Sequence, residues 1–94
     1  MTISEFKSSL TDNQPPAGIS VYLQSLWYDG KGDWEKAHSL VDSLAGIEAA
    51  HVHAYLHRKE GDLGNADYWY RRAKQTRPNV DLVREWEDLV IKFL

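Results

Sequence analysis

The chain has no cysteine among its 94 residues. Cysteine supplies the sulfur of disulfide bonds, thiol nucleophiles and thiolate zinc ligands, so all three are excluded. The longest apolar runs fall far short of the roughly 20 residues that a membrane-spanning helix needs. The first ten residues also have neither the basic nor the apolar region of a signal peptide. We therefore expect a cytoplasmic protein.

Basic residues are scarce as well: 11 Lys and Arg stand against 14 Asp and Glu, for a net charge of −3. Nucleic acids and anionic membranes attract basic surfaces, so we expect neither as a partner. The chain lacks the Gly-x-Ser-x-Gly turn of many hydrolases and any glycine-rich phosphate-binding loop. We therefore expect no enzymatic activity and no cofactor.

What the chain does contain is a repeated phrase, Gly-Asp-x-x-x-Ala, at residues 32–37 and again at 61–66. In each copy the glycine can end one helix and the aspartate can cap the next. A repeated turn between paired helices is typical of helical repeat proteins. Apolar residues at helical spacing around these turns predict helices at about 18–29, 33–45, 47–60, 62–77 and 79–94.

The two ends of the chain have distinct patterns. Residues 1–16 form a polar N-terminal arm, although Ile3, Phe6 and Leu10 recur at helical spacing and would let the arm dock as a short helix. Residues 17–94 then form a single helical domain. Its last helix has a strongly apolar stripe, in which we expect burial of Leu82, Val83, Trp86, Leu89, Val90 and Phe93, with Glu85 exposed.

The second repeat resembles a tetratricopeptide (TPR) motif. The small, turn, small, aromatic, small and proline positions of that motif correspond to Ala54, Gly61, Ala66, Tyr70, Ala73 and Pro78. The first repeat is shorter, because the two glycines lie 29 residues apart and the motif recurs about every 34. The resemblance implies an all-α fold, with two antiparallel helical hairpins over about residues 18–78 and a C-terminal capping helix. The segments WYDGKGDW and HAYLHRKEGDLGNADYWYRRA also resemble a group of short bacterial proteins of unknown role.

In TPR-like proteins the first helix of each hairpin lines a partner-binding groove. The resemblance places on this groove Tyr22, Leu26, His51, Tyr55, Arg58 and Lys59. An apolar wall beside a basic and aromatic one suits an amphipathic segment with an acidic end. We therefore expect a non-enzymatic protein–protein interaction module that binds a partner segment or a second copy of itself. The N-terminal arm is the favoured cover for the apolar wall, and a second copy is the alternative.

Two histidines offer another interpretation. His53 and His57 stand four residues apart on one helix face, as helical metal-binding pairs do, whereas His51 lies about 200° from His53. A zinc site needs three or four ligands, and this face has no Asp or Glu as a third. We therefore expect the pair to be packed and hydrogen-bonded, without a metal. A small His-based metal- or ligand-binding protein is the alternative.

Overall fold

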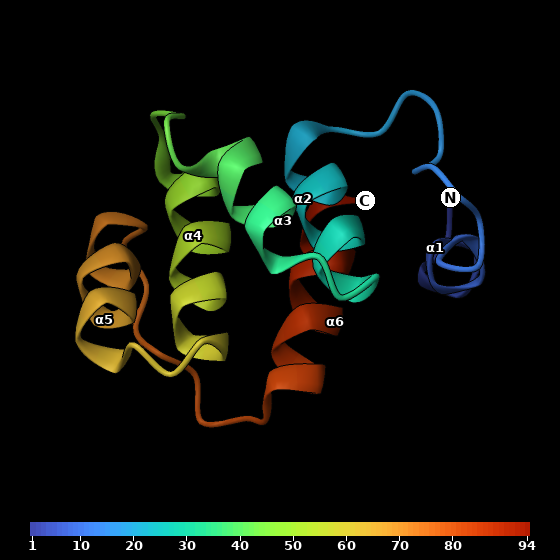
Figure 1. Cartoon of the computed structure of the whole chain (residues 1–94). Coiled ribbons are helices and arrows are strands. Elements are labelled where there is room, and N and C mark those ends of the chain that lie inside the picture. The colour runs from blue at the N-terminus through green and yellow to red at the C-terminus, as the bar shows by residue number, and fades with distance from the viewer.

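The chain folds into six α-helices and no strand, which confirms the prediction of an all-α fold (Figure 1). The structure is a computed structural model that describes residues 1–94. Its helices are α1 (Ile3–Ser9), α2 (Val21–Gly30), α3 (Trp34–Val41), α4 (Ile47–Lys59), α5 (Leu63–Arg72) and α6 (Leu82–Phe93). None of them is long and apolar enough to cross a membrane.

The repeated Gly-Asp phrase forms the same turn twice. Gly32 and Gly61 have φ angles of +88° and +89°, in the left-handed region that glycine adopts without steric cost. The next residues, Asp33 and Asp62, donate their backbone N–H groups to carbonyl oxygens five residues back, at 2.9 and 3.0 Å. Their carboxylates cap α3 and α5. Both predicted caps are confirmed, and both turns have the hydrogen bonds of a Schellman motif.

Four helix boundaries differ from those predicted. Helix α2 begins at Val21, three residues later than expected. Helix α3 ends five residues before Gly46, which instead precedes α4 with a φ of +103°. Helix α5 ends early because Lys74 turns into the left-handed region, with a φ of +59°. Helix α6 is capped by Asp81, which accepts from the backbone N–H of Arg84 at 2.8 Å, and not by Asn79. Short polar residues at neighbouring positions compete for such caps, and only the path of the loop selects one.

The helices pack as two antiparallel hairpins with a covering helix. Helix α2 pairs with α3, α4 pairs with α5, and α3 joins the hairpins by packing on α4. Figure 1 shows α5, α4 and α3 side by side, with α6 behind α2 and α3. Helix α6 contacts α1, α2 and α4, and Phe6, Trp27, Leu56 and Leu89 belong to the main core between them. The first helices of both hairpins therefore face α6.

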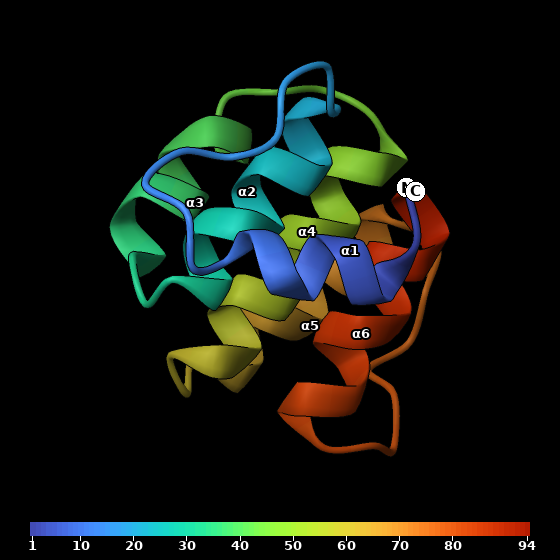
Figure 2. The same cartoon turned by 90° about the vertical axis from the view of Figure 1, so that its right-hand side faces the viewer.

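The N-terminal arm is docked, as its apolar spacing suggested. Phe6 on α1 is fully buried, with its ring 5.8 Å from that of Trp86 between centroids. The indole of Trp27 donates to the hydroxyl of Ser9 at 3.1 Å. Figure 2 shows α1 in front of α4 and α6.

However, a different helix from the one expected covers most of the apolar wall, which is the surface formed by Ile19, Tyr22 and Leu26. The arm was predicted to shield Ile19, Tyr22 and Leu26, but α6 lies against Tyr22 and Leu26. The Phe93 ring packs on Tyr22 at 5.1 Å between centroids, and the Trp86 indole donates to the carbonyl oxygen of Leu26 at 2.9 Å. An amphipathic helix covers more apolar surface than the two turns of α1 can, so α6 takes this position.

Helices α4 and α5 approach closely because small residues meet between them. Ala54 and Ala66 are both fully buried beside Tyr70. We expect Ala66→Leu to overpack this contact and lower the free energy of unfolding by about 1–3 kcal/mol, as measured by urea denaturation. The control is Ala45→Leu in the exposed loop before α4, which should change it by less than about 0.5 kcal/mol. Equal stability of the two variants would contradict the packing of α4 on α5.

Candidate functional site

The basic and aromatic residues predicted on α4 are paired with carboxylates of the chain itself. Asp29 of α2 is only 2% exposed. One of its oxygens accepts from the Tyr55 hydroxyl at 2.6 Å, and the other accepts from the Lys59 ammonium at 2.8 Å. Burial, with the nearby Asp29 charge, raises the pKa of Tyr55 far above its usual value. The phenol therefore remains a hydrogen-bond donor to Asp29.

A second buried carboxylate comes from α6. Glu85 is 3% exposed and accepts from the Arg58 guanidinium at 2.8 Å and from the Tyr70 hydroxyl. Burial and the bond to Glu85 raise the pKa of Tyr70 in the same way. Arg58 also donates to the carbonyl oxygen of Val80. Because a buried charge must be paired, this network sets the position of α6 on α4.

Glu85 also explains an error in the predicted face of α6. Glu85 was expected to be exposed and Val83 buried, whereas Val83 is 69% exposed. Residues two apart on a helix point to nearly opposite sides. Once Glu85 turns inward to meet Arg58, Val83 must face outward. The apolar pattern of α6 could not predict this inward turn, because the contact between Glu85 and Arg58 is polar.

Five of the six residues predicted to line an open groove therefore lie wholly or partly in an internal interface. Leu26 and Tyr55 are 0% and 2% exposed, so neither side chain presents a wide surface to a partner. Tyr22 and Arg58 are half-buried against α6 and its preceding loop, and Lys92 of α6 donates to the Nδ1 atom of His51 at 2.8 Å. Only Lys59 keeps an exposed side chain. Helix α6 fills most of the predicted groove.

One part of the groove stays open, and we call it the end pocket. It lies where α2 and α4 end and α6 begins, with a volume of about 420 Å³. Apolar walls from Leu10, Leu82, Val83 and Trp86 enclose polar groups from Asp29, Tyr55 and Lys59. Gly30 also lines it, and a Cβ atom there would come within 3.1 Å of the Leu10 and Trp86 side chains. The missing side chain at Gly30 lets both walls close in.

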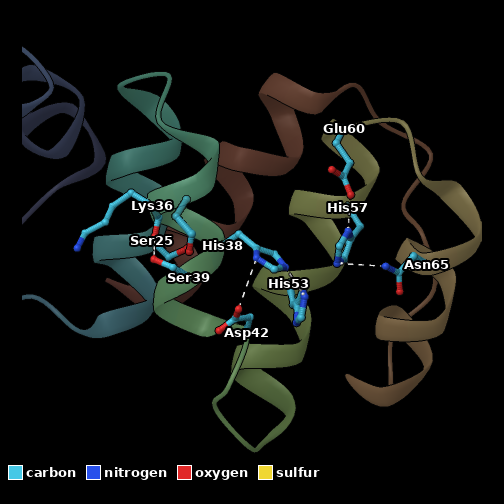
Figure 3. Close-up of polar contacts among 10 residues, drawn as sticks. Ser25, Lys36, His38, Ser39, Asp42, His53, His57, Glu60 and Asn65 are labelled. Carbon is cyan, nitrogen blue, oxygen red and sulfur yellow. Dashed lines mark hydrogen bonds and ion pairs between the residues drawn. The ribbon is translucent and has the colours of Figure 1, made fainter.

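The opposite side of α4 carries a second polar group, which we call the histidine cluster. His53 and His57 lie on α4, and His38 of α3 joins them. Figure 3 shows the three rings between α3, α4 and α5. The Nε2 atoms of His38 and His53 are 2.9 Å apart, and the rings of His53 and His57 stack with centroids 4.7 Å apart. The predicted packing of His53 and His57 is present, with a partner that the sequence analysis did not name.

Carboxylates and an amide surround the cluster. The Nδ1 atom of His57 is 2.6 Å from a Glu60 oxygen, and its Nε2 atom is 3.3 Å from the Asn65 amide nitrogen. Asp42 lies 3.7 Å from the Nδ1 atom of His38. Every buried polar side-chain atom in the structure has a hydrogen-bond partner.

Sequence reasoning missed His38 although a signal was present. The buried stripe of α3 includes Trp34 and Val41, and His38 stands four residues after the first and three before the second. Helical spacing therefore puts His38 on the same face as both. The sequence did not show which face of α4 this stripe of α3 would pack against. That face depends on how the two hairpins pack together.

The histidines predict a pH-dependent stability. Burial, with His38 and His57 nearby, lowers the pKa of His53 to about 4, below the value of about 6.5 for an unfolded chain. Between these values only the unfolded chain binds the proton, so stability should fall as pH drops from 6.5 toward 4. His53 can contribute at most about 3 kcal/mol over that range.

Urea denaturation at pH values from 7 to 5 measures this effect above the range in which most carboxylates titrate. His51, whose pKa burial and Lys92 also lower to about 4, adds a slope of the same sign. His53→Gln should therefore flatten the dependence without abolishing it. An unchanged slope in His53→Gln would contradict the assigned burial of this imidazole.

Comparisons of the chain with protein-family models, with curated proteins and with solved structures found no match. No relative therefore supplies a function. The end pocket and the histidine cluster are the features from which a function can be inferred.

Proposed function

We propose that the chain is a non-enzymatic, TPR-like protein-interaction module of the cytoplasm, and that it binds an amphipathic segment of a partner protein through the end pocket. The observation that carries this proposal is the end pocket itself. It is an open cavity of about 420 Å³ with apolar walls and a charged group at its edge. Sites that bind small ligands or single side chains combine these two features.

Packing within the second hairpin supports the TPR-like part of the proposal. The resemblance requires small residues where the two helices of a hairpin meet. Ala54 and Ala66 are fully buried at that contact, and Ala73 is 2% exposed. The resemblance also implies a helix after the second hairpin, and the C-terminal helix α6 packs on the first helices of both hairpins, α2 and α4.

The chemistry of the end pocket indicates the kind of partner. Its walls are side chains of Leu10, Leu82, Val83 and Trp86, which suit one large apolar side chain. Lys59 has three N–H donors, and its bond to Asp29 uses one of them. Because the Lys59 side chain is 38% exposed, its other donors can reach a carboxylate outside the protein. The expected ligand is therefore an apolar residue close to an Asp or Glu.

Selection of random peptides by phage display on the immobilised protein tests this specificity. We expect the selected peptides to share a large apolar residue next to an acidic one, and to bind the monomeric protein in fluorescence polarisation. Val83→Asp places a charge in the wall of the end pocket and should weaken binding at least tenfold, which is about 1.4 kcal/mol. Val83 is exposed, so the variant should remain folded.

Two controls make the result specific. Ile91→Asp changes another exposed apolar residue of α6, one that lies outside the end pocket, and should bind as the unchanged protein does. Replacing the acidic residue of the peptide by its amide should weaken binding, because Lys59 then loses its charged partner. Peptides without a common pattern, or binding that survives Val83→Asp, would refute the proposal. A dimer that Val83→Asp dissociates would assign the end pocket to a second copy.

A further inference from the structure

We propose that His38, His53 and His57 form a binding site for a divalent transition-metal ion, with Zn²⁺ as the representative ion. One ligand nitrogen from each side chain lies within 4.8 Å of one from each of the others. Figure 3 shows the His38 and His53 rings close together, with the His57 ring beside them on the side of Asn65. This site is separate from the end pocket, which lies on the α2 and α6 side of α4.

The spacing of the nitrogens is close to that of a zinc site. With Zn–N bonds of about 2.0 Å, two tetrahedral ligands have nitrogens roughly 3.3 Å apart. The Nε2 atoms of His38 and His53 are 2.9 Å apart. To admit an ion, the two nitrogens would separate by a few tenths of an ångström and both rings would tilt, so that each lone pair points to one site beside the line that joins them. His57 must move further, by turning its Nε2 atom from the Asn65 amide toward the other two rings.

Glu60 prepares His57 for this role. A carboxylate only accepts hydrogen bonds, so the 2.6 Å contact with Nδ1 places the imidazole hydrogen on that atom. The lone pair is then on Nε2, where the Asn65 amide meets it at 3.3 Å. A carboxylate that holds the second nitrogen of a ligand histidine is the usual support of zinc sites. Asp42 lies 3.7 Å from Nδ1 of His38, the equivalent position on a second ligand.

The ligand type and its surroundings select the class of ion. Three imidazoles suit Zn²⁺, Cu²⁺ or Ni²⁺, whereas Mg²⁺ and Ca²⁺ prefer oxygen ligands. The rings of Trp34 and Trp69 stack on His38 and His53, at 4.8 and 4.0 Å between centroids. Such apolar walls limit access of water to a bound ion.

From the sequence, we expected His53 and His57 to be packed and hydrogen-bonded without a metal, because only these two histidines shared a helix face. His38 supplies the third ligand from the neighbouring hairpin, so that objection no longer holds. Three protein ligands leave one position of a tetrahedral ion for water or an outside donor. An ion bound here would join α3 to α4 and stabilise the folded chain, because ligands of the native state raise its melting temperature.

The test is a calorimetric titration of the full chain, without a polyhistidine tag, with ZnCl₂ at neutral pH. We expect one ion to bind per chain, with a rise in melting temperature that saturates. Co²⁺ should give the intense visible absorption of a tetrahedral complex. His38→Gln should weaken Zn²⁺ binding at least tenfold, and Glu60→Gln should weaken it about 10–100-fold through the orientation of His57.

His51→Gln is the matched control, because His51 lies on α4 outside the cluster and pairs with Lys92. It should bind Zn²⁺ as the unchanged protein does. Circular dichroism checks that each variant is folded. If His38→Gln does not fold, the Glu60→Gln variant tests the proposal, because Glu60 is exposed. Absence of saturable binding, or equal affinity in the cluster variants and the control, would show that the cluster is only a packed, hydrogen-bonded contact.

Discussion

The arrangement of the helices depends on two buried carboxylates that meet cationic and phenolic groups of α4 and the Tyr70 phenol of α5. Asp29 accepts from Tyr55 and Lys59, and Glu85 accepts from Arg58 and Tyr70. An unpaired charge at such a depth would be strongly destabilising. The two contacts therefore fix where α2 and α6 lie against α4, and they fix the rotation of α6 about its own axis.

The same pairing shows that most of the groove predicted on α4 is occupied by the chain itself. A basic and aromatic wall beside an apolar one suits an amphipathic segment with an acidic group, and α6 is such a segment. It brings Glu85 to Arg58 and Phe93 to Tyr22. The chain thus provides its own occupant for most of that surface. The end pocket is the remainder, left open because α6 begins there and exposes Val83.

Helix α4 separates two different chemical environments. On the side of α2 and α6 its residues form ion pairs and phenol–carboxylate bonds, beside an apolar cavity. On the side of α3 and α5 it presents imidazoles between two tryptophan rings. Both environments come from one 13-residue helix, in which eight residues are buried. A helix buried on nearly all sides can serve two sites because each neighbouring helix meets a different face.

The sequence by itself determined the all-α class and the two Gly-Asp turns, because caps and helical spacing are properties of neighbouring residues. The spacing of Ile3, Phe6 and Leu10 allowed the arm to dock as a helix but did not require it. The sequence also indicated that His53 and His57 share a face. Only the tertiary structure decided that Glu85 turns inward, that α6 covers Leu26, and that His38 joins the histidine pair from 15 residues away. Each of these contacts depends on the angle and rotation at which whole helices pack, and local sequence patterns do not encode either quantity.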